Sequence, residues 1–417
     1  MSNDTRPEIR FPGFTEDWEE RKLGDMMDVT SVKRIHQSDW TNSGIRFLRA
    51  RDIVSAAKNE EPSDYLYISE EKYNEYSKNS GKVSQGDLLV TGVGSIGVPL
   101  LITDDNPIYF KDGNIIWFKN EHKIDGNFFY YSFINNKIQK YIRDVAGIGT
   151  VGTYTIDSGK KTPISLPTYD EQIKIGSFFK QLDHTIMLHQ HELDLLKETK
   201  KGFLQKMFPK NGAKVPEIRF PGFTEDWEER KLGGIGKTYT GLTGKSKEDF
   251  GHGDAKFVTY MNVFQNPKAT LEQLENVEID PRQNEVKKGD VFFTTSSETP
   301  EEVGMSSVWT HDINNIYLNS FTFAYRPTIK FDLDYLAFML RSQSVRKKII
   351  YLAQGISRYN ISKTKMMDIS VPIPVNFEEQ QKIGAFFKQL DDTIALHQRK
   401  LDLLKETKKG FLQKMFV

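Results

Sequence analysis

The chain is an internal tandem duplication. Residues 7–24, PEIRFPGFTEDWEERKLG, return letter for letter at 216–233, and Asp170–Phe208 returns at Glu378–Phe416 with 32 of 39 positions identical. The offsets of 209 and 208 residues agree, so the 417 residues form two matched halves. The material between the repeated segments has diverged widely. Two matched frames with unlike inserts suit a protein that reads two different things at a fixed separation.

Composition limits the class of protein. A chain of 417 residues is too long for one ordinary domain, whereas each half has ordinary domain size. Cysteine is absent, which excludes disulfides and cysteine-based zinc sites. The polar start lacks the apolar core of a signal peptide, and no apolar run approaches the roughly 18 residues of a membrane span. We therefore expect a cytoplasmic protein that does not enter membranes.

The second repeated segment predicts two long helices with a coiled-coil seam. Apolar residues recur at alternating spacings of four and three, and their mean period of 3.5 is typical of coiled coils. Similar interfaces pair most economically about a twofold axis, which predicts that the helices pack antiparallel. The alternative is that both are ordinary core helices of one large domain. The predicted interface comprises Phe179, Leu182, Ile186, His189, Leu193 and Leu196 in the first helix and Phe387, Leu390, Ile394, His397, Leu401 and Leu404 in the second.

The inserts contain segments typical of strands, such as DLLVT at 87–91 and DVFFTT at 290–295, each followed later by a helical pattern. The predicted fold class is therefore mixed α/β. Two globular domains are expected, separated by two long helices that form an antiparallel coiled coil, in a tandem repeat with pseudo-twofold symmetry.

Motifs for catalysis or cofactor binding are weak. Gly92–Gly97 matches G-x-G-x-x-G, but a second strand-like segment containing Pro99 follows it where a nucleotide site needs a helix. A hairpin turn explains these glycines better. Asp105–Tyr109 partly resembles the base-holding loop of amino-methyltransferases, although a turn before a strand is the better interpretation. The histidines lack metal-ligand spacing, so the sequence predicts no metal site and no catalytic residue.

The diverged inserts supply candidates for nucleic-acid recognition. When the two halves are aligned, Arg49, Arg51 and Asp52 of the first half correspond in that order to Thr259, Met261 and Asn262 of the second. Arginine can bridge guanine and asparagine can bridge adenine, so such exchanges fit two different base sequences. Neutral drift on solvated strand faces would give the same pattern. Glycine-opened loops with polar and cationic residues suit phosphate and base-edge contacts. The predicted DNA-binding residues are Arg49, Arg51, Asp52, Thr150, Tyr154 and Lys160 in the first half and Lys245, Lys247, Thr259, Asn262, Arg358, Tyr359 and Asn360 in the second.

The charge balance argues mildly against unaided DNA binding. The chain has 57 basic and 57 acidic residues, whereas proteins that bind DNA alone usually carry a basic excess. The basic groups must therefore lie on one face, or a partner must supply much of the contact with the phosphates.

The chain resembles the specificity (S) subunit of type I restriction-modification systems over nearly its full length. The resemblance rests on the duplicated helices that begin Glu171-Gln172 and Glu379-Gln380, on the Pro-containing strands before them, and on the Gly86-Asp87 and Gly289-Asp290 strands. The Gly94–Gly97 turn also matches, but the second half departs from it. The resemblance implies target recognition domains at residues 1–168 and 213–376, a spacer helix with linker at 169–212, and a second spacer helix at 377–417.

The resemblance also implies a function. Each recognition domain would read one half of a bipartite, asymmetric site in double-stranded DNA, and the helices would set the spacer. Two methyltransferase (M) subunits would carry S-adenosylmethionine and methylate adenine at N6, and restriction (R) subunits would add ATP- and Mg²⁺-dependent translocation and cleavage. The S subunit would bind no cofactor and perform no catalysis. The alternatives are a standalone DNA methyltransferase or nuclease with built-in recognition, and a coiled-coil scaffold for proteins.

Overall fold

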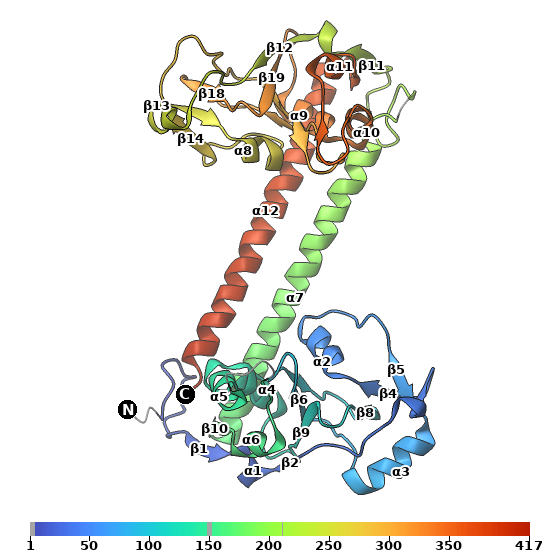
Figure 1. Cartoon of the computed structure of the whole chain (residues 1–417), viewed down its shortest axis with the longest axis vertical. Coiled ribbons are helices and arrows are strands. Elements are labelled where there is room, and N and C mark those ends of the chain that lie inside the picture. The colour runs from blue at the N-terminus through green and yellow to red at the C-terminus, as the bar shows by residue number, and fades with distance from the viewer. Residues whose placement is uncertain (1–4, 148–151, 211) are drawn as a thin grey trace. The chain divides into compact units, whose positions relative to one another are not determined.

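The structure is a computed structural model that describes residues 5–147, 152–210 and 212–417. The chain divides into two units. Unit 1 comprises the chain up to Gln190 together with Arg399–Val417, and unit 2 comprises His191–Gln398. Two 38-residue helices, α7 (Tyr169–Lys206) and α12 (Phe377–Lys414), each contribute to both units (Figure 1). Unit 1 therefore contains the last residues of the chain as well as the first.

Unit 1 is built on two four-stranded sheets and one short strand pair. One sheet has the order β2 (Asp28–Thr30), β9 (Ile115–Lys119), β6 (Leu88–Thr91), β7 (Pro99–Leu101), and the other has the order β3 (Trp40–Thr41), β5 (Leu66–Ile68), β4 (Ile45–Leu48), β8 (Ile108–Phe110). β1 (Glu19–Lys22) pairs with β10 (Pro163–Leu166). The helices are α1 (Leu23–Met26), α2 (Ala50–Ala57), α3 (Glu70–Ser80), α4 (Gly126–Ile134), α5 (Asn136–Ala146) and α6 (Ile156–Lys161), with a 3₁₀ turn at Gln37–Asp39.

Unit 2 repeats this topology. Its four-stranded sheet has the order β12 (Gly236–Thr240), β19 (Thr322–Pro327), β15 (Val291–Thr294), β17 (Ser306–Val308), and its three-stranded sheet has the order β14 (Leu274–Val277), β13 (Phe250–Val258), β18 (Ile316–Leu318). β11 (Glu228–Lys231) pairs with β21 (Ser370–Ile373), and β16 (Ser296–Ser297) pairs with β20 (Tyr359–Asn360). The helices are α8 (Tyr260–Gln265), α9 (Leu333–Arg341), α10 (Gln343–Tyr351) and α11 (Lys363–Met367), with 3₁₀ turns at Leu232–Gly234 and Lys247–Asp249.

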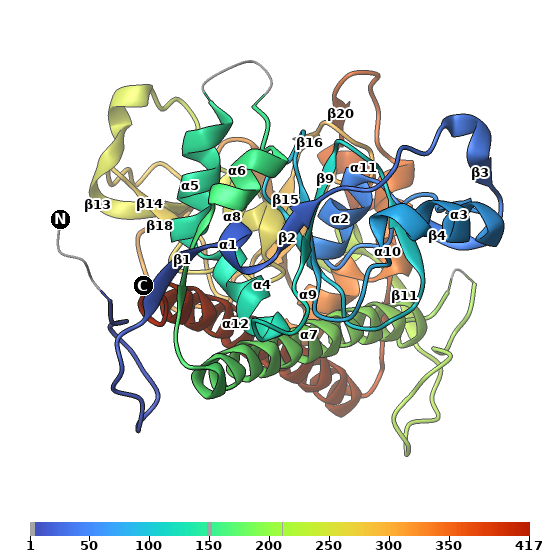
Figure 2. The same ribbon diagram turned by 90° about the horizontal axis from the view of Figure 1, so that it is seen from below.

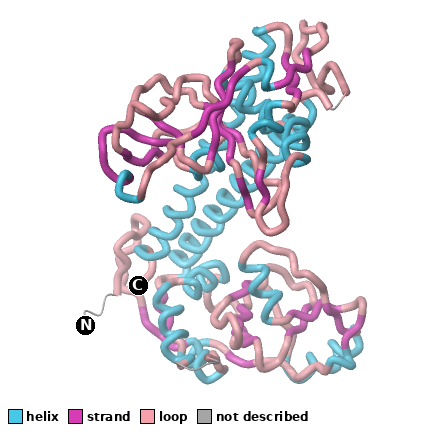
Figure 3. The backbone as a smooth tube through the Cα atoms, turned by 45° about the horizontal axis from the view of Figure 1, so that its top comes forward, coloured by secondary structure: helices cyan, strands magenta, loops and turns pink. Residues whose placement is uncertain are grey.

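The alternation of strands and helices in both units confirms the predicted mixed α/β class (Figure 3). The glycines at 92–97 lie between β6 and β7, which pair antiparallel with Leu88 opposite Leu101. This is the hairpin that the sequence favoured over a nucleotide loop. None of the helices in the described ranges combines the length and apolar character that crossing a bilayer requires.

A buried ion pair joins each copy of the letter-for-letter repeat to the start of a long helix. In unit 1, Arg10 donates through Nε and Nη2 to the two carboxylate oxygens of Glu171, at 2.7 and 2.7 Å. In unit 2, Arg219 makes the same two bonds to Glu379, at 2.7 and 2.8 Å. Both glutamates are buried in the first turn of a long helix. Because such a fork-shaped pair tolerates little change at either end, it accounts for the matched arginine in the repeated segment and the matched glutamate at the helix start.

The residue after each glutamate attaches the long helix to the rest of its unit. Gln172 accepts a hydrogen bond from the Asp125 backbone and donates one to the Pro167 carbonyl. Asp125 caps α4 and lies so close to α7 that a Cβ on Gly176 would be 2.4 Å from its carboxylate. Glycine is therefore required at this crossing. The same contacts recur in unit 2 among Gln380, Asp332, Pro374 and Gly384.

Within each unit the two long helices pack antiparallel. In unit 1, Phe178 of α7 meets Phe411 of α12 and Asp183 meets Lys408, so α12 numbers fall as α7 numbers rise. In unit 2, Phe203 meets Phe386. Every residue of the predicted seam is buried or half-buried, whereas apolar residues off the seam, such as Leu195 and Leu403, are exposed. The pairing of two long helices is thus confirmed.

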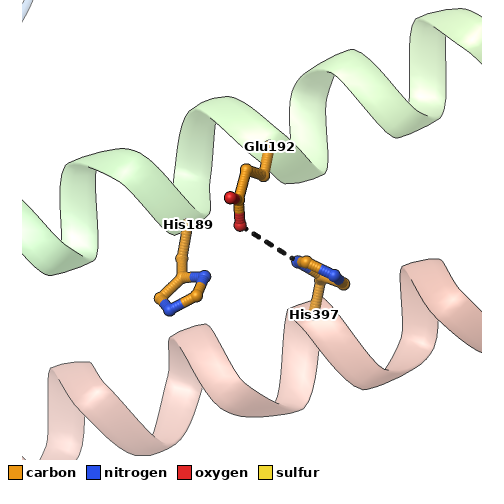
Figure 4. A group of neighbouring side chains, drawn as sticks. All are labelled: His189, Glu192 and His397. Atoms are coloured by element: carbon orange, nitrogen blue, oxygen red, sulfur yellow. Dashed lines mark ion pairs between the residues drawn. The ribbon is translucent and has the colours of Figure 1, made fainter.

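A polar contact also occupies the seam of unit 2. Glu192 of α7 and His397 of α12 approach to 3.6 Å between Oε2 and Nδ1, an ion pair when the imidazole is protonated (Figure 4). For His397, an interhelical polar contact was the role expected from its place in the heptad pattern.

Candidate nucleic-acid interface

The residues that the sequence aligned for base reading begin a helix in each unit. In unit 1, β4 runs parallel to β8 with Phe47 opposite Tyr109, and α2 starts directly after β4. In unit 2, β13 runs parallel to β18 with Phe257 opposite Tyr317, and α8 follows. The alignment is therefore structurally correct. Arg49 and Thr259 are N-cap residues of short helices, so the strand faces invoked by the neutral-drift alternative do not carry them.

In unit 1 the first and third aligned residues hold the fold together. The guanidinium of Arg49 donates to Asp52 from Nε and Nη2, at 2.9 Å each, and to Asp64 from Nη1, at 2.8 Å. These hydrogen bonds, the one to Asp52 above all, raise the pKa of Arg49, and the guanidinium lowers the pKa of Asp64. Asp52 is only 4% exposed. The prediction that Asp52 contacts bases is therefore wrong, because its carboxylate is buried against Arg49.

The same two positions are structural in unit 2. The Thr259 hydroxyl caps α8 by accepting from the Asn262 backbone and donates to the Gln273 carbonyl. Asn262 is fully buried. Its side-chain amide donates to the Thr270 carbonyl at 2.8 Å and accepts from the Thr270 N–H at 2.9 Å. The prediction that Asn262 contacts bases is therefore also wrong, because its amide is buried. In both units the first and third aligned residues hold the loop that follows the helix. An ion pair with Asp64 does this in unit 1, and amide hydrogen bonds of Asn262 do it in unit 2.

The middle aligned residue is the one that faces solvent. The Arg51 side chain is 58% exposed and its only ion pair among the described residues is with the exposed Asp64. Met261, its counterpart in unit 2, is 48% exposed. An arginine and a methionine thus occupy the same exposed position at the start of equivalent helices.

The remaining candidates of unit 1 fall into three situations. Tyr154 is 2% exposed, its hydroxyl bonds Thr162, and burial raises its pKa. Its backbone N–H bonds the Gly92 carbonyl, so Tyr154 is a core residue and its prediction as a DNA contact is wrong. Lys160 is exposed in the last turn of α6. Thr150 lies outside the described residues.

In unit 2, three of the predicted residues lie on one hairpin. Gln354 and Asn360 exchange two backbone hydrogen bonds, at 3.0 and 2.8 Å, which close a tight loop that carries Arg358. Arg358 and Asn360 are exposed and Tyr359 is half-buried. β20 of this hairpin pairs with β16, and the Tyr260 hydroxyl at the start of α8 bonds the Ser296 carbonyl of β16. The hairpin and the α8 N-terminus are therefore both attached to β16, and Figure 2 shows β20 at the edge opposite α7 and α12.

The two predicted lysines of unit 2 lie elsewhere. The Lys245 ammonium lies between Asp249 and Asp280, at 3.7 and 3.4 Å, and its side chain is 10% exposed. Lys247 is exposed on the neighbouring 3₁₀ turn. Lys245 thus has internal carboxylate partners, whereas Lys247 projects into solvent.

Sequence reasoning missed two exposed apolar residues of unit 2, Phe321 and Ile356, which are 63% and 96% exposed. The missed signal was the alignment of Phe321 with Asn114 of the first half, whereas Ile356 aligns with Ile148 and gave no such contrast.

The chain matches a known family model. A model described as the type I restriction modification DNA specificity domain matches residues 15–198 and 224–406. The putative type I restriction enzyme MjaX specificity subunit of Methanocaldococcus jannaschii is 25% identical, with 95% of this chain and 92% of that protein covered. The putative specificity subunit S.HindORF215P of Haemophilus influenzae is 32% identical over 163 residues, 39% of each chain.

Solved structures show the same fold. The type I restriction-modification S subunit from M. genitalium aligns over 99% of both chains with a TM-score of 0.56 and 15% identity. The HsdS subunit from Thermoanaerobacter tengcongensis aligns over 98% of both chains with a TM-score of 0.51 and 16% identity.

Proposed function

The chain belongs to the type I restriction-modification DNA specificity family, and from this premise we propose that each unit reads one half of a bipartite, asymmetric DNA site. The observation that carries the proposal is the exposed position shared by the two units. One fold presents Arg51 in unit 1 and Met261 in unit 2 at the start of equivalent helices. Unlike side chains on a common frame are what two unlike half-sites require.

The proposed DNA contacts are the exposed members of the predicted set together with the half-buried Tyr359. Arg51 and Lys160 remain in unit 1, and Lys247, Arg358, Tyr359 and Asn360 remain in unit 2. Arg49, Thr259 and Lys245 bond other residues of this chain, so we propose that they stabilise the DNA-reading surface and do not contact bases. Arg358 can donate two hydrogen bonds to guanine, and Asn360 can pair with adenine.

The long helices are proposed to set the spacer. Each has 38 residues, about 57 Å at 1.5 Å per residue. Successive major grooves on one face of DNA lie roughly 34 Å apart, a distance that helices of this length can span. Because each helix contributes to both units, its length is suited to fix the separation of the two reading surfaces.

Two copies of one partner are proposed to bind the repeated surface. Leu193–Phe208 and Leu401–Phe416 are identical at all 16 positions, and 7–24 is identical to 216–233. The identity includes exposed residues such as Leu195 and Leu403, 60% and 68% exposed. Folding rarely demands identity at exposed positions. A pair of M subunits, one on each copy, explains why these surfaces stay matched while the reading surfaces diverge.

The partners also account for the neutral charge and for the chemistry. With 57 charges of each sign, this chain is expected to rely on the M subunits for much of the phosphate contact. S-adenosylmethionine is expected on the M subunits, and ATP and Mg²⁺ on the R subunits. A chain that directs such subunits to chromosomal DNA is expected in the cytoplasm.

The test is methylome sequencing of cells that express this chain with its M subunits, compared with cells that lack it. We expect one asymmetric bipartite motif. Insertion of one heptad after Gln190 and after Gln398 lengthens each helix by about 10 Å, or about 3 base pairs, and keeps the seam in phase. The spacer should grow while both half-sites stay the same. Altered half-sites with the old spacer would refute the proposal, as would methylation by the purified chain without M subunits.

A further inference from the structure

Three exposed apolar side chains of unit 2 surround one short segment, Thr295–Ser297. The Phe321 carbonyl accepts hydrogen bonds from the Thr295 backbone and hydroxyl, at 3.2 and 2.8 Å. Met261 follows Tyr260, whose hydroxyl bonds the Ser296 carbonyl at 2.8 Å. Ile356 lies in the tight loop that ends at β20, the strand paired with Ser296 and Ser297. We name Met261, Phe321 and Ile356 the apolar triad.

Hydrogen bonds anchor the three segments that carry the triad. The Phe321 N–H donates to the Asn319 side chain at 2.9 Å, so hydrogen bonds fix both the N–H and the carbonyl of this residue. The loop that carries Ile356 is closed by the two backbone bonds between Gln354 and Asn360. Met261 stands on α8, whose C-terminal carbonyls accept bonds from Arg341. Large apolar side chains are thus displayed to solvent at fixed positions, 48%, 63% and 96% exposed.

Unit 1 differs from unit 2 at two of these three positions, those of Met261 and Phe321. Arg51 replaces Met261, and Asn114 replaces Phe321, since the Asn114 carbonyl accepts from Gly92 as the Phe321 carbonyl accepts from Thr295. Ile148, outside the described residues, aligns with Ile356, because Gly147-Ile148 matches Gly355-Ile356. A partner that binds both units alike needs matched surfaces, whereas two of the three triad members are unmatched. The occupant of the triad is therefore the ligand that differs between the units, which is the DNA half-site.

We infer that the apolar triad reads the 5-methyl groups of thymines in the half-site bound by unit 2. The thymine methyl is the one apolar group on a base edge in the major groove, and phenylalanine is among the side chains that contact it. The exposed Arg358 and Asn360 on the same hairpin supply polar base contacts beside it. This inference rests on the proposed function and adds a base preference: the half-site of unit 2 contains thymine, and its recognition depends on the methyl group.

Deoxyuridine is the direct probe, because it differs from thymidine only by the absence of that methyl. Duplexes that carry the methylated motif would be prepared with deoxyuridine at each thymidine of one half-site in turn. Methylation by the complex of this chain with its M subunits would then be measured. We expect kcat/KM to fall about fourfold for each contacted methyl, the factor that corresponds to one buried methylene. The effect should be confined to one half-site.

Variants connect the effect to the triad. Phe321→Asn, which installs the residue of unit 1, should abolish the deoxyuridine effect at one position. Tyr351→Asn is the matched control, because Tyr351 is 89% exposed but lies on α10 outside the triad. It should leave the effect unchanged.

Three results would overturn the inference while the proposed function stands. The first is a bipartite motif that is methylated equally well with deoxyuridine, and the second is a motif whose half-sites contain no thymine. The third is a Phe321→Asn variant that no longer assembles with the M subunits. Absence of any bipartite motif with the unaltered chain would instead refute the proposed function itself.

Discussion

Asp183 of α7 forms an ion pair with Lys408 of α12, with 2.6 Å between Oδ1 and Nζ. In unit 2 the equivalent residues exchange helices, and Lys200 of α7 pairs with Asp391 of α12. Equivalent residues of parallel helices would lie level, aspartate beside aspartate, so the exchange is a direct signature of antiparallel pairing.

Charge reversal tests this pairing. Asp183→Lys brings two ammonium groups together and should lower the free energy of unfolding by about 2 kcal/mol, whereas the double variant Asp183→Lys with Lys408→Asp should recover most of it. Urea unfolding measures both. Lys409→Asp is the control, because the Lys409 side chain is 65% exposed. The pairing is disproved if the double variant is no more stable than the single one.

The buried ion pair between Arg219 and Glu379 should be more costly to break. Glu379→Gln leaves the Arg219 guanidinium without its two carboxylate bonds, and we expect a loss of about 3 kcal/mol in the free energy of unfolding. Glu378→Gln is the matched control one residue away, where the side chain is 65% exposed. Its cost should be below about 0.5 kcal/mol. Equal costs for the two variants would show that the ion pair does not stabilise unit 2.

Phe208 and Phe416 are equivalent residues with unequal burial. Phe208 is 1% exposed between Trp227, Tyr335 and Phe387, while Phe416, one residue from the chain end, is half-buried. Phe208→Ala should cost about 3–5 kcal/mol and Phe416→Ala about half as much. Thermal unfolding compares them. A larger loss for Phe416→Ala would contradict the burial argument.

Arg341 positions the helix that carries Met261. Its guanidinium bonds the Val263, Phe264 and Ser306 carbonyls, and burial lowers its pKa to about 10. Arg341→Gln should reduce discrimination in the half-site of unit 2 about tenfold, measured as methylation of single-base variants of the motif. Arg346→Gln also removes a buried arginine, but one bonded to the Gly304 and Val303 carbonyls. It should lower stability without altering discrimination, and similar losses in both variants would exclude a positioning role.

Each unit has one exposed arginine that should read bases. Arg51→Ala should relax base choice in one half-site and Arg358→Ala in the other, by about 1–3 kcal/mol per bidentate contact. Arg49→Ala is the comparison. Because Arg49 is bonded to Asp52 and Asp64, its loss should destabilise unit 1 instead. Relaxation of both half-sites by either single variant would contradict one reading surface per unit. Sequencing of the methylated motif provides the measurement.

The long helices and the two-unit organisation could be predicted from sequence, because both leave a repeated pattern in it. Heptad spacing defined the seam, and the duplication defined the equivalence of the units. The reading surface was less accessible. Arg49, Asp52 and Asn262 have residue types that suit base contacts. Arg49 instead bonds Asp52 and Asp64, and Asn262 bonds the backbone of the loop at 266–273. Polar residues that bind bases and polar residues that fasten loops look alike until the partners are known.

Completion of unit 1 by Arg399–Val417 has a consequence for biosynthesis. At 5–20 residues per second, a ribosome needs roughly 20–80 s to make such a chain, and domains generally fold as they emerge. The first 190 residues must here wait for residues 399–417, which are made more than 200 residues later, and the site of Met415 and Phe416 is uncovered in the meantime. Termination of translation before residue 399 would therefore damage unit 1 as well as unit 2.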